Sequence, residues 1–273
     1  MKSGFPVFLA AFVVLGSSWC GFVLAPTLQL GGAKQTSVLN SSDTYPVQRT
    51  GDATLGLQVY RANGCAACHT EQIQQDGMTC DVVLMGAGKN PSAVSNLIST
   101  LKLRDVTKQE ADAASDKISA AGGKVEIHIL ATGADISRGW GIRRSVAEDF
   151  LYDYPVQPGS LRAGPDLANV GARLADANWQ MLHLYAPQAV VKGSMMPPFR
   201  FLFEKREKIN GQSSPDALNL PKEFAPAAGC EIVPTEDAKK LVQYLLSLHA
   251  DVPLYDAPFT PPQISTNAPA SKK

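Results

Sequence analysis

The sequence predicts a mainly helical protein that begins with a transmembrane helix and carries a small inserted α+β subdomain. Three observations support this fold class. The chain opens with a long uncharged stretch. Apolar residues recur at helical spacing both before Cys65 and near the end of the chain, and a β-α-α-β pattern occupies residues 80–131. Basic and acidic residues number 25 each, so the charge balance gives no reason to expect a nucleic-acid partner.

Residues 4–33 contain no charged side chain and are rich in Phe, Val and Leu. About 20 apolar residues suffice to cross a bilayer, so we predict a transmembrane anchor over residues 1–33. Two alternatives remain open, a cleaved signal peptide and a lipoprotein signal that ends at Cys20. Trp19 argues against the second. With Lys2 retained inside, the following chain lies outside the cytoplasm, in the periplasm of a bacterium with two membranes.

A polar tether is expected over residues 34–51, where Ser, Thr, Gly and Asn are frequent and apolar periodicity is missing. The main domain is predicted over residues 52–79 and 132–250 as an all-α unit. Its first helix is capped by Asp52 and ends at Asn63-Gly64, because glycine readily takes the left-handed conformation that closes a helix.

A second helix signal closes this domain near the other end of the chain. Thr235 is followed by two acidic residues and then by apolar residues at helical spacing, which predicts a helix from Thr235 to about His249. The remaining residues, 251–273, are rich in proline and end in two lysines. We expect a tail without a core of its own.

The insert at 80–131 has its own element pattern. Strand signals lie at 81–84 and 124–130, and helix signals at 91–103 and 107–121. The segments "CDVVLMGAGKNPSAVSNLISTL" and "GGKVEI" resemble the C-terminal domain of the bacterial ribosomal stalk protein. That resemblance implies a compact α+β subdomain and carries no ribosomal role for an exported segment.

The strongest chemical signal is Cys65-Ala66-Ala67-Cys68-His69, the spacing that attaches a c-type haem. Two thiols at this spacing add to the two vinyl groups of one haem, and the adjoining histidine becomes the proximal iron ligand. A Cys-x-x-Cys redox pair and half of a zinc site are the alternatives. The first needs no adjoining histidine, and the second lacks a second Cys-x-x-Cys. The main domain is therefore predicted to be a class I-like cytochrome c domain.

Met196 is the predicted sixth ligand of the iron. It lies in Ser194-Met195-Met196-Pro197-Pro198, where the prolines hold an extended loop. Met195 and His183 remain as rival ligands. The other methionines, Met78, Met85 and Met181, are expected to be core filler. Structural or solvent-exposed roles are expected for His128 and His249.

Pro165 is predicted to support the proximal histidine. It lies in the run Gly164-Pro165-Asp166-Leu167 that follows Arg162. The proline carbonyl can accept the ring N–H of the proximal histidine and so orient the imidazole. A plain tight turn is the alternative reading. We assign both Pro165 and Arg162 to the cofactor site.

Two further cysteines, Cys80 and Cys230, are left once the haem motif is used and Cys20 is placed in the membrane. In an oxidising compartment they either form a disulfide or remain as buried thiols. Sequence spacing alone does not decide between the two.

With these motifs in place, the chain resembles subunit II of the cbb-type haem-copper cytochrome c oxidases, a membrane-anchored monohaem cytochrome. The likeness covers the anchor, "GCAACHTEQI", and the region from Arg138 to Phe199, which contains "RGWGIRRSVAEDFLYDYPVQPGS", "RAGPDLANVGAR" and "WQMLHLYAPQAVVKGSMMPPF". It implies Met196 as the axial ligand, and it implies Gly56 and Tyr60 as the crossing point of the first and last helices. The insert, Cys80 and the Gln157-Pro158 pair depart from the family pattern.

The resemblance implies an electron-transfer subunit that takes electrons from a donor cytochrome and passes them, with other cytochrome c subunits, to a haem-copper catalytic subunit. Oxygen chemistry would not occur on this chain, because a haem with two axial ligands has no open position. Two alternatives are a monohaem cytochrome that serves a nitric oxide reductase or quinol-oxidising complex, and a haem-based sensor or binding protein.

Overall fold

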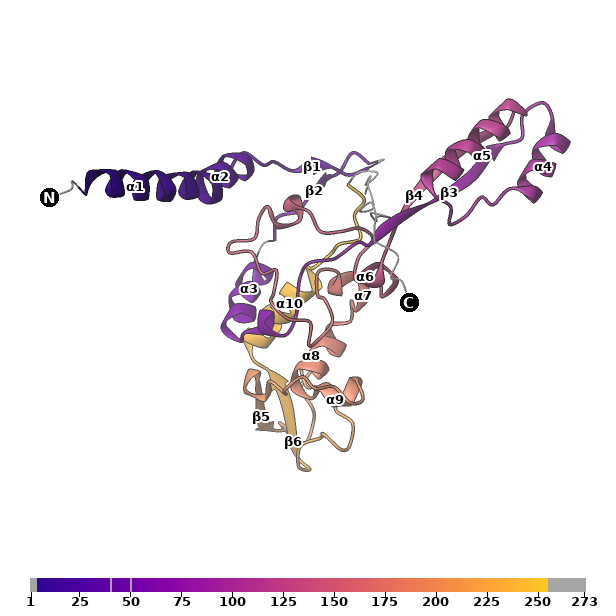
Figure 1. Cartoon of the computed structure of the whole chain (residues 1–273). Coiled ribbons are helices and arrows are strands. Elements are labelled where there is room, and N and C mark those ends of the chain that lie inside the picture. Colours follow the sequence, from indigo (N-terminus) through magenta and orange to yellow (C-terminus); the bar gives the residue numbers. More distant parts are fainter. Residues whose placement is uncertain (1–3, 40, 50, 255–273) are drawn as a thin grey trace, which may run out of the picture. The chain divides into compact units, whose positions relative to one another are not determined.

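The computed structural model describes residues 4–39, 41–49 and 51–254. Over these residues the regular structure is mainly helical, with small two-stranded antiparallel sheets. The chain divides into two units, residues 1–48 with 146–156 and residues 49–145 with 157–273 (Figure 1), and each is described by itself. Lys2 and nearly all of the predicted tail at 251–273 lie outside the described residues.

The first unit begins with one continuous apolar helix from Phe5 to Gln29, whose mean hydropathy is 2.2 and whose side chains are not buried. It consists of α1 (Phe5–Trp19), the π-helical turn η1 (Cys20–Leu24) and α2 (Ala25–Leu30). Pro26 cannot donate a backbone hydrogen bond, which accounts for the wider turn before it. With 25 residues, this helix is long enough to be a membrane anchor.

The predicted tether contains a small amount of regular structure. β1 (Thr36–Ser37) pairs with β2 (Thr44–Tyr45) in an antiparallel ladder. The side chain of Gln35 donates a hydrogen bond to the Pro46 carbonyl oxygen at 2.9 Å. The sequence analysis did not foresee this pairing, because a two-residue strand leaves no readable alternation in the sequence. The short helix η3 (Ala147–Phe150) belongs to the same unit.

The second unit is organised around α3 (Asp52–Ala62) and α10 (Glu236–Leu246). Thr235 caps α10 as predicted, since its hydroxyl accepts from the backbone N–H of Ala238. Helix α10 ends at Leu246, slightly before the predicted end. The prediction that Asp52 caps α3 was wrong: Asp52 is the first helical residue and Gly51, with φ of 58°, precedes it. Asn63 and the left-handed Gly64 close α3 as expected.

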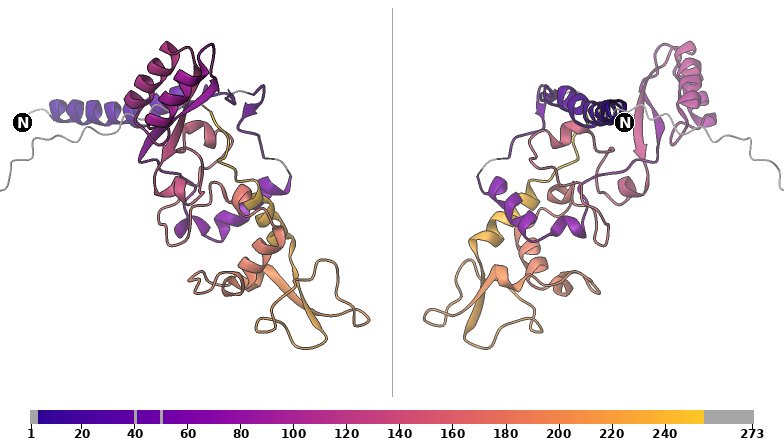
Figure 2. Two further views of the ribbon diagram at one scale, coloured as in Figure 1. Left: turned by 90° about the vertical axis from the view of Figure 1, so that its right-hand side faces the viewer. Right: turned by 60° about the vertical axis from the view of Figure 1, so that its left-hand side comes forward.

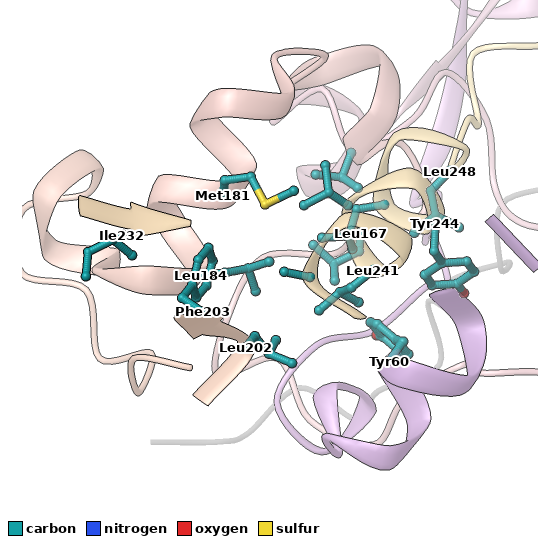
Figure 3. Packing of buried hydrophobic residues seen from close by; sticks show 14 residues of the cluster. Tyr60, Leu167, Met181, Leu184, Leu202, Phe203, Ile232, Leu241, Tyr244 and Leu248 are labelled. Carbon is teal, nitrogen blue, oxygen red and sulfur yellow. The ribbon is translucent and has the colours of Figure 1, made fainter. Parts of the chain in front are cut away.

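Helices α3 and α10 cross at Gly56. A β-carbon at this position would lie 2.0 Å from the Lys240 carbonyl oxygen and 2.8 Å from Cβ of Tyr244. One turn later, Tyr60 packs on Tyr244 with ring centroids 5.2 Å apart (Figure 3). Both rings are fully buried. The absence of a side chain at Gly56 therefore sets the close approach of the two helices.

The same core continues into the short helices α7 (Val170–Arg173), α8 (Ala177–Tyr185) and η4 (Arg200–Leu202). Helix α9 (Pro187–Val190) follows α8 and contacts it. Beyond them, β5 (Phe203–Glu207) pairs with β6 (Cys230–Pro234). Leu184 of α8, Phe203 of β5 and Ile232 of β6 belong to one buried cluster (Figure 3). The all-α prediction for residues 132–250 was therefore wrong, because the charged sequence of β5 does not alternate like a strand.

The insert forms the predicted β-α-α-β order. β3 (Gly77–Gly86) and β4 (Lys124–Thr132) form an antiparallel hairpin, and α4 (Pro91–Thr100) and α5 (Lys108–Ala120) come between them in the sequence (Figure 2). Thr107 and Glu110 form a capping box at the start of α5. The insert has its own apolar core; its fully buried members are Cys80, Val94, Ala111 and Ile118.

Candidate functional site

The Cys-x-x-Cys-His motif forms one tight turn at the end of α3. The 3-10 turn η2 (Cys65–Ala67) follows left-handed Gly64. The backbone N–H groups of Cys68 and His69 both donate to the Cys65 carbonyl oxygen, at 3.1 and 3.0 Å. This turn presents two thiols and an imidazole within five residues.

Pro165 orients the His69 ring. Its carbonyl oxygen lies 2.8 Å from Nδ1 of His69. A carbonyl can only accept, so Nδ1 carries the proton and Nε2 is the nitrogen left to bind a metal. Gly164 packs against the same ring, and its N–H donates to the Cys68 carbonyl oxygen at 2.9 Å. The backbone of the run that contains Pro165 therefore fixes the position of the imidazole.

Arg162 joins three segments that are distant in the sequence. Its guanidinium donates to the Thr70 hydroxyl at 2.9 Å, to the Gln72 carbonyl oxygen at 2.5 Å and to the buried carboxylate of Asp135 at 3.0 Å. Asp135 belongs to α6 (Ala134–Ser137), directly after the insert, and also accepts from the Gln74 backbone N–H. Arg162 therefore fixes the backbone that follows His69 and is not among the residues that line the pocket described below.

Asp166 is a site residue that the sequence analysis did not single out. Its side chain is fully buried. It accepts from the Thr70 hydroxyl at 2.6 Å, the Gln72 N–H at 2.9 Å and the Ala168 N–H at 2.8 Å. A carboxylate directly after Gly-Pro is the sequence signal that could have identified it, because such residues commonly bind nearby backbone N–H groups.

His69, Cys65 and Pro165 line one pocket together with Met196. Its cavity volume is about 60 Å³, and the cavity is partly open to solvent. The rest of the wall is mostly apolar and comes from the helices of the core; its apolar members include Leu167, Val170, Leu174, Trp179, Leu184, Leu241 and Leu245. The pocket thus combines an oriented imidazole and a thioether in an apolar setting.

The two adjacent methionines have different environments. Met196 is partly buried, lines the pocket and packs against the main core. Met195 is 86% exposed and is not part of the pocket wall. An extended loop directs neighbouring side chains to opposite sides, which accounts for the difference. The geometry favours Met196 over Met195 as a ligand.

Among the described residues, Arg173 Nε in the pocket wall is buried without a hydrogen-bond partner. Tyr60 Oη and His183 Nδ1 are buried there without a hydrogen bond of ordinary geometry, with Glu71 and the Pro187 backbone as their respective polar neighbours. Burial lowers the pKa of Arg173, and Asp166 opposes this shift. Burial, followed by the nearby His69, lowers the pKa of His183, and the Pro187 backbone opposes the shift. Buried polar groups are normally paired, so these atoms indicate a ligand with polar groups.

A haem fits this set of residues. Its ring matches the apolar walls, its iron matches an imidazole and a thioether, and its acidic side groups match the cationic Arg173. The sequence analysis missed Arg173. Its signal is a single basic side chain within the apolar helical run "LANVGARL".

The competing readings of the cysteine motif are less compatible with the site. Burial raises the pKa of the Cys65 thiol to about 12, whereas reactive redox cysteines have lowered pKa values. Within the described residues, no cluster of three or more His, Cys, Asp or Glu side chains could hold a metal ion. The thioredoxin-like and zinc readings therefore lack the local chemistry they require.

The remaining histidines and cysteines lie away from the pocket wall. His128 is on β4, with Nε2 3.5 Å from a carboxylate oxygen of Glu126, and His249 follows α10. Cys80 and Cys230 do not form a disulfide, which leaves the alternative of two thiols. Cys80 is fully buried in the core of the insert, and Cys230 begins β6.

The other methionines are also outside the pocket wall. Met181 is buried in the main core, as expected for a core residue. Met78 is partly buried on β3. Met85, near the end of β3, is 59% exposed and is not core filler.

Part of the chain matches a known protein family. Residues 134–225 match the family described as "Cytochrome C oxidase, mono-heme subunit/FixO". The match supports a FixO-type subunit. It covers about a third of the chain and includes Arg162, Pro165, Arg173 and Met196, whereas the cysteine motif and the insert precede it. A comparison of the chain with curated proteins gives no match, and nothing supports the likeness of the insert to the ribosomal stalk protein.

Proposed function

We propose that this chain is the electron-transfer subunit of a respiratory terminal oxidase and relays single electrons through one covalent haem c. Cys65 and Cys68 would attach the haem, and His69 and Met196 would bind its iron. The observation that carries the proposal is that His69, oriented by Pro165, shares one apolar pocket with Met196. The haem, when bound, supplies an iron that takes up and gives off one electron.

The residues of the chain have distinct tasks in this proposal. Pro165 fixes the tautomer and orientation of His69, and Arg162 and Asp166 hold the backbone behind it. The apolar wall excludes water, and methionine ligation raises the reduction potential. Arg173 supplies a positive charge for an acidic group of the haem. Pro165, Arg162 and Asp166 together keep the His69 side of the site rigid, which limits structural change there during electron transfer.

The proposed location follows from the apolar helix Phe5–Gln29. It anchors the chain in the bacterial inner membrane, and the haem domain lies on the periplasmic side. The proposed partners are a haem-copper catalytic subunit, other cytochrome c subunits and a donor cytochrome. The match to an oxidase subunit favours this assignment over a nitric oxide reductase, a quinol-oxidising complex or a sensor.

The test combines attachment, ligation and assembly. The full chain is expressed with the haem attachment machinery, and haem is stained on a denaturing gel. We expect a stained protein band, and the double substitution Cys65→Ala with Cys68→Ala should remove the stain.

The near-infrared absorption band of methionine-ligated ferric haem should disappear in Met196→Ala and persist in Met195→Ala. A tagged chain should co-purify with a haem-copper subunit and become oxidised by it in the presence of oxygen. The absence of haem staining at the wild-type protein band would contradict the proposal.

A further inference from the structure

A third ligand-type side chain lies in the pocket. His183 of α8 lines the same wall as His69 and Met196. Its Nδ1 atom is buried and makes no hydrogen bond of ordinary geometry among the described residues, with the Pro187 backbone as its polar neighbour. Imidazole is a good iron ligand, and a buried ring nitrogen without an ordinary hydrogen bond indicates a group that the pocket is built to receive.

The His183 ring is held in a fixed orientation. It stacks on Trp179 one turn earlier, with ring centroids 4.9 Å apart and an angle of 11° between the planes. The neighbouring Leu184 is buried in the core and keeps α8 in place. An imidazole held in this way loses little side-chain entropy when it binds a metal.

Met196, in contrast, lies in an irregular loop with exposed neighbours. Val191 and Met195 on this loop are 40% and 86% exposed. The N–H of Met196 donates only a long hydrogen bond, 3.3 Å, to the Ser194 hydroxyl. A loop with few buried contacts opens at a lower free-energy cost than a packed helix. Met196 is therefore easier to displace from the pocket than His183.

We propose that His183 is a reserve axial ligand, and that its ring nitrogen takes the place of the Met196 sulfur when the loop opens. One iron–sulfur bond breaks and one iron–nitrogen bond forms, with no change in the number of electrons. This inference rests on the proposed haem function. The exchange replaces a ligand that raises the reduction potential, so the histidine-ligated form has the lower potential and accepts electrons less readily.

The experiment uses the full chain with its haem. The variants are Met196→Ala, His183→Phe and the double variant, with Met195→Ala as the matched control on the exposed neighbour. His183→Phe keeps an aromatic ring on Trp179 and removes the ring nitrogens, and His183→Leu is the second choice if it folds poorly. The measurements are the haem spin state, the near-infrared band, carbon monoxide binding and the reduction potential. Far-ultraviolet circular dichroism verifies folding.

We expect Met196→Ala to lose the near-infrared band but remain low-spin, with a lowered potential and little carbon monoxide binding. The double variant should become high-spin and bind carbon monoxide at least about tenfold better. A high-spin Met196→Ala protein, a low-spin double variant, or a Met196→Ala spectrum identical to wild type would each overturn the reserve-ligand inference alone. Absence of covalent haem in the wild-type chain would overturn this inference and the proposed function together.

Discussion

A β-carbon added at Gly164 would lie 2.2 Å from Cε1 of His69 and 2.7 Å from Nδ1. The backbone at Gly164 therefore approaches the imidazole as closely as its atoms allow. Because Pro165 accepts the His69 hydrogen bond from the adjacent position, both contacts depend on the same two peptide units. The orientation of the proposed iron ligand is set by backbone atoms rather than by a side chain.

We predict that Gly164→Ala will displace the His69 ring. The added methyl group cannot be accommodated without moving either the imidazole or the Pro165 carbonyl. Changes behind a metal ligand typically cost at least about tenfold in affinity or activity. The yield of low-spin haem, measured by absorption per mole of protein, should fall by about tenfold. Gly86→Ala is the control, since nothing lies within 4 Å of a β-carbon there. An unchanged yield would show that the ring can shift without consequence.

We predict that Arg162→Leu will lower the free energy of unfolding by about 2 kcal/mol. The change leaves the carboxylate of Asp135, whose side chain is 4% exposed, without its cationic partner. The value is below the usual cost for a fully buried pair because Arg162 itself is 27% exposed. Denaturant unfolding measures the effect.

The matched control for Arg162 is Lys239→Met, which removes exposed ion pairs with Asp216 and Glu236. Exposed pairs contribute little, so the control should change stability by less than about 1 kcal/mol. Equal effects of the two substitutions would contradict a structural role for Arg162 behind His69.

We predict that Gly56→Ala will separate α3 from α10 and lower the free energy of unfolding by about 2 kcal/mol or more. The clash is with the Lys240 carbonyl oxygen, which is backbone and cannot rotate away. Thermal unfolding compared with Gly86→Ala isolates the effect of the crossing from that of any glycine replacement. A Gly56→Ala protein as stable as wild type would mean that the helices can repack.

We predict an acid-sensitive step in the β5–β6 region. Hydrogen bonds from the Ser214 N–H and from Arg206 lower the pKa of Glu231 below its ordinary value of 4.5. A lowered pKa in the folded state means that the stabilisation is present above pH 4.5 and is lost as the pH falls through the lower, folded value. Glu231→Gln should reduce this loss of stability at acid pH. Thermal unfolding as a function of pH measures it, and exposed Glu204→Gln, on β5, should leave the profile unchanged.

We predict that the insert can be removed without loss of the haem site. Thr79 of β3 faces Leu130 of β4, so residues 80–129 can be replaced by Asn-Gly, which favours a tight hairpin turn. The buried core of the insert is separate from the main core. Covalent haem and the near-infrared band should remain in the shortened chain. Their loss would show that the insert supports the pocket, contrary to the proposed domain boundaries.

Much of the local structure could be predicted from sequence. The cap at Thr235, the capping box at Thr107 and the glycine that ends α3 are local signals, and the structure contains each of them. The β-α-α-β order of the insert was also readable, because its periodicity changes between strands and helices. These features depend on residues only a few positions apart.

The residues missed by sequence analysis depend on distant contacts. The position of Asp166 after Gly-Pro is a local signal, but its bonds to Thr70 and Gln72 are set by the fold. The lone basic Arg173 is visible in the sequence, but its place in an apolar pocket wall is not. Strand β5 pairs through its backbone while most of its side chains are exposed, so it leaves no alternating pattern.

The partners of the cysteine motif are also late in the chain. Pro165 lies 96 residues after His69, and Arg162 lies 92 residues after Thr70. If the chain crosses the membrane from its amino end, as the proposed location requires, Cys65 and Cys68 are exposed before the segment that contacts His69 follows. Closure of such a distant contact is also slow compared with the folding of a local turn. The order of synthesis thus leaves an interval in which both thiols are accessible to an attachment enzyme.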